Sequence, residues 1–220
     1  NDPKLELEYL LAMQNNSCAG LLLLATVLTP QHERLLERLR VPCVLIGQYS
    51  KNYPCVYHDD FHAARELAEL VLKRGRRRLC YLGTTEEDVA AGLRRRQGVE
   101  AAMQEQGLPI EELRVRRCDF TGESGCAAMT ELLAEDDRID GVLCATDSIA
   151  LGAMMALRSH GKHLPSGVSV TGFGDNWACN TAVPPLTTAH LYYRESGVEA
   201  VRLLMDMLDN PSASMPPRST

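Results

Sequence analysis

Apolar, strand-like runs alternate with helical segments along almost the whole chain, and this alternation is the feature that most limits the possible folds. Within 141–197, three apolar runs (Gly141–Ala145, Val168–Gly172 and Leu186–His190) each end in small or polar residues. Strands that are separated by helices pair in parallel, through right-handed crossovers. Because ligands bind at the carboxyl ends of the strands in an open α/β sheet, we expect the residues after these runs to face a ligand.

The same alternation predicts the other elements. Periodicity and capping signals predict helices at 3–16, 30–40, 60–74, 94–106, 123–134, 148–159 and 195–208, and strands at 19–26, 41–47, 55–57, 79–83 and 115–118. We expect the strand at 19–26 to be buried on both faces, Asp60 to cap its helix, and the tail 210–220 to be coil. The fold class is therefore α/β. Because the N-terminal half starts with a helix and has few strands, we infer that its first strand and helix are absent from this sequence.

Composition is that of an ordinary globular protein. The chain has 220 residues, of which 45% are hydrophobic and 24% charged, and its formal net charge is −6. An acidic balance disfavours a nucleic-acid surface within these residues, because phosphate binding needs a basic face. The basic run Lys73–Arg78 spans a helix end, where cations complement the helix dipole, so we interpret it as a solvated end. The longest apolar run, Ala19–Ala25, is too short to span a membrane, and no signal-peptide pattern opens the sequence; we expect no membrane partner.

The eight cysteines are scattered, without CxxC spacing. We interpret them as small buried side chains in a reducing compartment, with a disulfide framework or a zinc site as the alternative. The pairs His58/His62 and His160/His163 have metal-like spacing, but no cysteine or carboxylate completes a recognisable motif, so we expect no metal. Because nucleotide-binding, serine-hydrolase and zinc-protease motifs do not occur, we expect neither a cofactor nor catalysis.

The order of these segments is similar to that of one known family. The chain resembles the effector-binding domain of the LacI/GalR family of bacterial transcriptional repressors in the strings AGLLLLAT, VPCVLIGQ, VYHDDFHAARELAELVLKRGRRRLCYLG, GLRRRQGVEAAM, CDFTGESGCAAM, DGVLCATDSIALGAM, VSVTGFGD and PPLTT. The resemblance covers essentially the whole chain. It implies a periplasmic-binding-protein-like fold of two doubly wound parallel-sheet subdomains joined by crossovers, here 1–57 plus 192–212 and 58–191. It also implies an upstream DNA-binding headpiece that this chain lacks, and a last family strand before which the chain stops.

The resemblance also assigns ligand-facing positions. Arg95 matches an arginine that clamps ligand hydroxyls or a carboxylate, although Arg94–Arg96 could instead be a solvated helix start. Phe120 matches an aromatic residue that stacks on the ligand, with a core position as the alternative. Thr146 and Asp147 match a pair at the pocket floor, and Asp147 is also expected to cap the following helix.

Gly174 is the sharpest departure from the family pattern. Most members have an aspartate at its position, and Gly47 replaces another frequent aspartate. Because the loss of two carboxylates removes acceptors and opens space, we expect a larger ligand, a disaccharide, with Asp175, Asn176 and Trp177 supplying hydrogen bonds and stacking. Trp177 could instead have a packing role in its loop. The expected ligand-binding residues are Arg95, Phe120, Thr146, Asp147, Phe173, Gly174, Asp175, Trp177 and Leu191, and the expected hinge residues on the crossovers are Tyr57, His58 and His190.

These inferences predict the sugar-binding and dimerisation domain of a cytoplasmic LacI-type regulator, with closest resemblance to repressors of sucrose and similar disaccharide operons. A ligand in the interdomain cleft would reorient the subdomains and, across a symmetric homodimer, two headpieces on operator DNA. The helix at 3–16 and the segment 59–65 are the expected dimer contacts. A periplasmic sugar-binding protein of an ABC transporter is the alternative, which eight unpaired-looking cysteines disfavour. An enzyme on a doubly wound fold is disfavoured because no nucleophile–base constellation occurs.

Overall fold

The computed structural model divides the chain into two compact units. The smaller unit comprises residues 1–59 and 192–220, and the larger unit residues 60–191. The structure describes residues 3–13, 18–39, 41–210 and 217–220. The first boundary falls after residue 59, two residues later than the boundary drawn from the sequence, and the second falls after residue 191, as drawn there.

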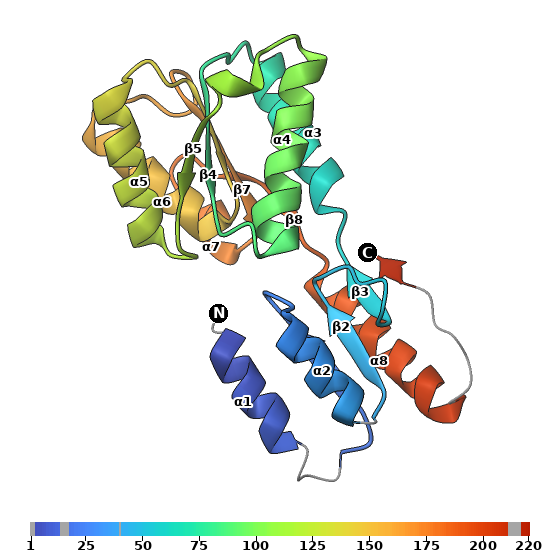
Figure 1. Cartoon of the computed structure of the whole chain (residues 1–220). Helices are drawn as coiled ribbons and strands as arrows, with labels where there is room; N and C mark the ends of the chain where they lie inside the picture. The colour runs from blue at the N-terminus through green and yellow to red at the C-terminus, as the bar shows by residue number, and fades with distance from the viewer. Residues whose placement is uncertain (1–2, 14–17, 40, 211–216) are drawn as a thin grey trace. The chain divides into compact units, whose positions relative to one another are not determined.

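The larger unit is a doubly wound parallel sheet with helices on both faces. Its five strands have the order β5-β4-β6-β7-β8, and each neighbouring pair is parallel. Helices α3 and α4 lie on one side of the strands, and α5 and α6 on the other (Figure 1). The elements are α3 (Asp60–Lys73), β4 (Leu79–Gly83), the π-helix η1 (Val89–Arg94), α4 (Arg95–Glu105), the 3-10 helix η2 (Ile110–Glu112), β5 (Arg114–Arg117), α5 (Gly122–Glu135), β6 (Gly141–Cys144), α6 (Asp147–Ser159), β7 (Ser169–Gly174), α7 (Trp177–Thr181) and β8 (Thr187–His190).

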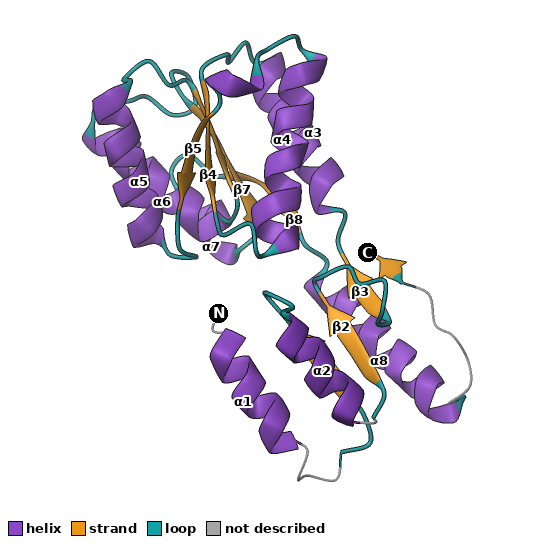
Figure 2. Cartoon of the chain, in the orientation of Figure 1, coloured by secondary structure: helices purple, strands orange, loops and turns teal. Residues whose placement is uncertain are grey.

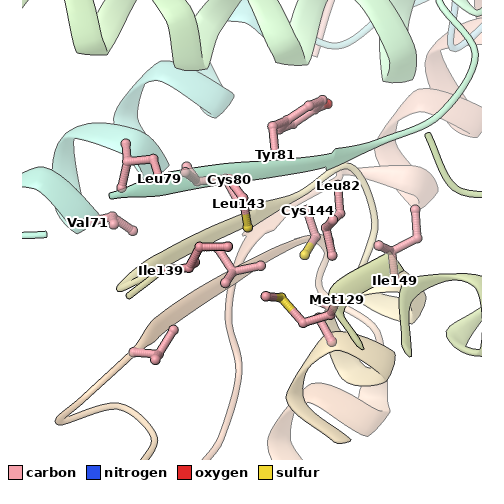
Figure 3. Close-up of a cluster of buried hydrophobic side chains, with 14 of the residues drawn as sticks. Val71, Leu79, Cys80, Tyr81, Leu82, Met129, Ile139, Leu143, Cys144 and Ile149 are labelled. Atoms are coloured by element: carbon pink, nitrogen blue, oxygen red, sulfur yellow. The ribbon is translucent and has the colours of Figure 1, made fainter. Parts of the chain in front are cut away.

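Apolar side chains from the inner strands fill both sides of this sheet. Figure 3 shows Tyr81 on one side of β4, with Leu82, Cys144 and Met129 gathered on the other. Each of these four side chains is at most 4% exposed. Burial of strands on both faces is what apolar, non-alternating runs predict for parallel sheets.

The smaller unit is built on a four-stranded sheet, coloured orange in Figure 2. Its elements are α1 (Pro3–Met13), β1 (Leu21–Leu24), α2 (Pro30–Leu39), β2 (Cys43–Ile46), β3 (Cys55–Tyr57), α8 (Tyr193–Asp209) and β9 (Arg218–Ser219). The sheet order is β1-β2-β3-β9, with all pairs parallel. Ala200 and Leu203 of α8 pack against Val44 and Val56 of the sheet. A second cluster contains Leu10 of α1, Leu35 and Leu36 of α2, and other side chains of the strands.

Two expectations for the smaller unit are wrong, and parts of three predicted segments lie outside the described residues. The strand at 19–26 is shorter and is not apolar-buried on both faces, since Leu24 is 70% exposed on a strand that ends the described sheet order. The tail is not all coil, because Arg218 and Ser219 pair with β3 as a last strand. Residues 14–16 of the predicted first helix, Arg40 of the second and residues 211–216 of the tail lie outside the described residues.

Candidate functional site

The carboxyl ends of the five strands in the larger unit form one polar edge. The chain passes from β4 to β5 on one side and from β6 to β7 and β8 on the other, so the direction of winding changes between β4 and β6. Ligands of doubly wound sheets bind at such a switch point. Thr84, Asp147 and Asp175 follow β4, β6 and β7, and His190 is the last residue of β8; this edge is the candidate site.

Arg95 lies at this switch point. It is the first residue of α4 and only 7% exposed. Its Nε donates to Asp60 Oδ1 at 2.7 Å, and its Nη1 donates to the carbonyl oxygen of Ala145, just after β6, at 2.5 Å. Its Cζ lies 3.7 Å from the centroid of the Phe173 ring. Within the described part of the chain Nη2 makes no hydrogen bond, so this nitrogen is the donor that Arg95 could offer to a ligand.

Asp60 is therefore not the simple helix cap that the sequence suggested. It is 4% exposed at the start of α3, and its carboxylate forms the ion pair with Arg95. The neighbouring Arg94, by contrast, is exposed, as a solvated helix start would be, with its Cζ 5.0 Å from the Phe61 ring centroid. A buried charge requires a partner. The buried Arg95 therefore pairs with Asp60, whereas the exposed Arg94 needs no such ion pair.

Asp147 accepts hydrogen bonds from Thr188 and Asn176 and does not cap the start of α6. Thr146 is the N-cap of α6, accepting from the backbone N–H of Ile149, which corrects the prediction that Asp147 would cap. The Asp147 carboxylate is 4% exposed. Its Oδ1 accepts from Thr188 Oγ1 at 2.5 Å, and its Oδ2 accepts from the backbone N–H of Asn176 at 2.7 Å. Asp147 thereby ties the ends of β6, β7 and β8 together.

The turn after β7 has an unusual backbone. Gly174 has φ +136°, a conformation that L side chains rarely adopt, and Asp175 has φ +56° in the left-handed region. An aspartate at position 174 would be strained there, which gives a physical reason for glycine at the sharpest departure from the family pattern. Asp175 Oδ2 lies 2.7 Å from His190 Nδ1, and the Asp175 N–H donates to Thr188 Oγ1 at 3.2 Å.

The remaining predicted ligand residues are spread along this edge. Phe120 is half-buried after β5, the strand at the opposite end of the sheet from β8. Phe173 and Leu191 are buried and pack with Ala64. Phe173 contributes to the edge indirectly, because its ring packs against the guanidinium of Arg95. Trp177 is 78% exposed and begins the short helix α7, where the sequence had suggested a loop. The Asn176 side chain caps this helix by accepting from Ala178 N–H, a signal readable from sequence.

The predicted hinge residues lie in different units. Tyr57 and His58 belong to the smaller unit, and His190 is the second-last residue of the larger one. His58 Nδ1 lies 3.2 Å from Thr220 Oγ1, and the His58 ring packs edge-on to Tyr193 with centroids 6.3 Å apart. The two connecting segments therefore meet inside the smaller unit, and a hinge role for them stays a prediction.

The cysteines are free thiols, and six of the eight are buried, as interpreted from the sequence. Burial raises the pKa of the Cys43 thiol to about 12 and that of Cys118 to about 11. At the candidate site, burial and then the Asp147 carboxylate raise the pKa of Cys179 to about 12. Among the described residues, no group of three or more His, Cys, Asp or Glu side chains is placed to hold a metal ion. None of the described helices combines the length and apolarity that a bilayer crossing requires.

Sequence reasoning missed the two residues that organise this edge. The sequence predicts a cap at Asp60 and assigns no role to Thr188, yet they hold Arg95 and Asp147 respectively. Both lie far in sequence from their partners. The signal for Thr188 is its place at the end of a predicted strand, beside other polar strand ends.

Comparison with known proteins agrees with this fold. Residues 68–220 match the family model described as "Periplasmic binding protein-like domain". The HTH-type transcriptional regulator CelR of Thermobifida fusca is 31% identical over 193 residues, which cover 86% of this chain and 56% of that protein. The solved transcriptional regulator CelR–cellobiose complex matches with a TM-score of 0.89 and 27% identity, over 98% of this chain and 67% of that one. A LacI family transcriptional regulator from Silicibacter pomeroyi matches with a TM-score of 0.86 and 28% identity, over 100% of this chain and 80% of that one.

The chain belongs to the family of periplasmic binding protein-like domains. Within that family, the predicted resemblance to the effector-binding domains of LacI-type regulators is confirmed by these relatives. The chain spans between 56% and 65% of the length of the first curated relatives that it matches. The named relatives are regulators, and none is named for a catalytic activity.

Proposed function

We propose that this chain binds a sugar effector and dimerises as part of a cytoplasmic LacI-type transcriptional regulator. The observation that carries the proposal is the polar carboxyl edge of the larger unit, where Arg95, Asp175 and His190 converge on the ends of three strands in a periplasmic binding protein-like fold. The cellobiose named with one solved relative supports a disaccharide as the effector class. Eight free thiols support a reducing compartment and disfavour the periplasmic transport alternative.

In this proposal the effector and operator DNA are coupled through a headpiece upstream of the residues described. The coupling is a difference in effector affinity between the DNA-bound and free forms, and it acts equally in both directions. The net charge of −6 on this chain agrees with DNA contacts being made elsewhere in the natural full-length protein.

Effector binding is tested by titrating cellobiose, sucrose and ribose against the fluorescence of Trp177, the only tryptophan of the chain. Its indole is 78% exposed after β7, so a sugar stacked on it would change its emission. Calorimetry on the same sugars is the second readout, because binding without contact to Trp177 is then still detected. A lack of heat and of fluorescence change with every sugar would contradict the proposed function.

A homodimer is the second part of the proposal. Two exposed apolar residues, Met155 at 67% and Val183 at 75%, are the sequence neighbours of Met154 and Pro184, which line a largely apolar cavity of about 280 Å³ in the larger unit. Exposed apolar side chains near a groove in the chain are a reason to test this face as an interface. Of the two contacts expected from sequence, α1 exposes Tyr9 (62%), and the segment 59–65 exposes Asp59 and His62 while it buries Asp60.

Sedimentation of the full-length protein tests the dimer and its face. We expect Met155→Asp or Val183→Asp to raise the dimer dissociation constant at least tenfold if this face carries the contact. Tyr9→Asp tests the α1 face in the same way. A monomeric wild-type protein at micromolar concentration would contradict the dimer altogether.

A further inference from the structure

The side chains of Thr188 and Asp147 hydrogen-bond to the backbone of the turn Gly174–Asn176. The sequence does not predict a contact between these two residues. Thr188 Oγ1 donates its only proton to Asp147 Oδ1 at 2.5 Å, which leaves its lone pairs to accept the N–H of Asp175 at 3.2 Å. The next N–H of the turn, that of Asn176, donates to Asp147 Oδ2 at 2.7 Å. Two successive backbone donors are thus fixed by one buried carboxylate, directly or through one hydroxyl.

Both oxygens of Asp147 are used in this way. The carboxylate is only 4% exposed, and a Cβ at Gly172 of β7 would lie 2.4 Å from its Oδ1. The strand therefore keeps a glycine where the carboxylate sits. Asp147 has the contacts of a residue that shapes the edge, rather than those of an acceptor for ligand hydroxyls.

Asp175 has the opposite character. Its side chain is 38% exposed, and Oδ2 is fixed by His190 Nδ1 at 2.7 Å. Its other oxygen, Oδ1, makes no hydrogen bond within the described part of the chain. The left-handed backbone at φ +56° turns this side chain out at the strand ends, and the Thr188 contact holds that conformation.

We infer that Asp175 is the carboxylate that accepts hydroxyls of the effector, that His190 orients it, and that Thr188 and Asp147 are positioning residues for its turn. The inference rests on the proposed function. A carboxylate fixed through one oxygen accepts hydroxyl donors through the other without losing further side-chain freedom. Position 174 has no carboxylate, and Asp175 then supplies the acceptor one residue later, from its own left-handed backbone conformation. The ligand class is a polyhydroxylated sugar.

The first experiment tests the scaffold without any ligand. Amide hydrogen exchange of Asp175 is measured by NMR in the full chain, in Thr188→Val and in Thr188→Ser. We expect exchange at Asp175 to be at least tenfold faster in Thr188→Val, which lacks the acceptor, and near wild-type in Thr188→Ser, which keeps it. Unchanged exchange at Asp175 in a folded Thr188→Val variant would overturn the positioning role.

The second experiment tests the acceptor with cellobiose, sucrose and ribose by calorimetry. We expect Asp175→Asn to weaken binding of the sugar that the wild type binds at least tenfold. His190→Ala should weaken it about fivefold, and His190→Asn should restore most of the affinity, because its amide can still donate to Asp175. Asp137→Asn, an exposed carboxylate before β6, is the matched control and should bind as the wild type does.

The outcomes separate this inference from the proposed function. If the wild type binds none of the sugars, the proposed function fails, and the acceptor role fails with it while the scaffold result stands. If the wild type binds a sugar and Asp175→Asn binds it equally well, the function stands and the acceptor role is overturned.

Discussion

Arg95 lies over the ring of Phe173, with its Cζ 3.7 Å from the ring centroid, while its Nε donates to Asp60. A buried guanidinium is tolerated only where its charge is paired and its donors are used. Here Arg95 contacts Asp60 at the start of α3, Ala145 after β6 and Phe173 near the end of β7. The pair Arg95–Phe173 thus couples the stability of the larger unit to the shape of its candidate site.

Replacement of Arg95 by glutamine should destabilise the protein strongly. The substitution leaves the carboxylate of Asp60 buried without its partner, for which we expect a loss of about 3–5 kcal/mol in the free energy of unfolding. Arg94→Gln is the matched control, because Arg94 is exposed and should change stability by about 0.5 kcal/mol at most. Urea unfolding of both variants measures the difference, and equal losses would refute the role given to Arg95.

Gly172→Ala should destabilise the larger unit. The added methyl would lie 2.4 Å from Asp147 Oδ1 and 2.9 Å from Leu186 Cδ2, an overpacked position for which we expect a cost of about 1–3 kcal/mol. Gly197→Ala, inside α8, meets nothing within 4 Å and should instead stabilise by about 0.5–1 kcal/mol. Thermal unfolding should therefore show shifts of opposite sign, and shifts of the same sign would count against the crowding at Gly172.

His32 should make the smaller unit sensitive to acid. Its side chain is fully buried in α2, with Nδ1 accepting from Thr29 N–H, and burial lowers its pKa below the ordinary value. Glu6 Oε2 lies 3.6 Å from Nε2. Because the folded state then binds the proton less readily than the unfolded chain, His32 contributes its full stability above the unfolded pKa of about 6.5. This contribution is lost as the pH falls from that value toward the folded pKa.

Urea unfolding at pH 7.5 and pH 5.5 tests this titration in the wild type and in His32→Asn. The asparagine keeps an acceptor for Thr29 but does not titrate. We expect the free energy of unfolding to fall less with acid in the variant, by up to about 1.4 kcal/mol, because pH 5.5 lies about one unit below the unfolded pKa. Identical pH dependence in both proteins would be incompatible with a depressed His32 pKa.

Thiol labelling should follow burial. Cys18 and Cys126 are half-buried, whereas the other six cysteines are buried. Desolvation raises the pKa of Cys80 and of Cys144, so little thiolate forms at either. Iodoacetamide at pH 8 should modify Cys18 and Cys126 first in the native protein, as read by mass spectrometry, and all eight in guanidinium chloride. Labelling of Cys80 as fast as Cys126 would show that the sheet opens readily.

The sequence by itself determined the order of the longer strands and helices, because apolar runs and helical periodicity are local properties. It therefore predicted the α/β class and placed β4, β6 and α6 within one or two residues, and the family resemblance supplied the periplasmic-binding-protein-like arrangement. Local signals failed where pairing decides the outcome. Residues 218–219 form a strand only because β3 offers an edge to pair with, and the run at 19–26 ends its described sheet with an exposed Leu24.

Only the tertiary structure decided what the polar residues do. Asp60 and Asp147 each have the sequence context of a helix cap, yet one pairs with Arg95, 35 residues away, and the other with Thr188, 41 residues away. The physical reason is burial: inside the protein an ionised carboxylate must be satisfied by whichever donors the fold brings to it, and donors distant in sequence leave no local pattern.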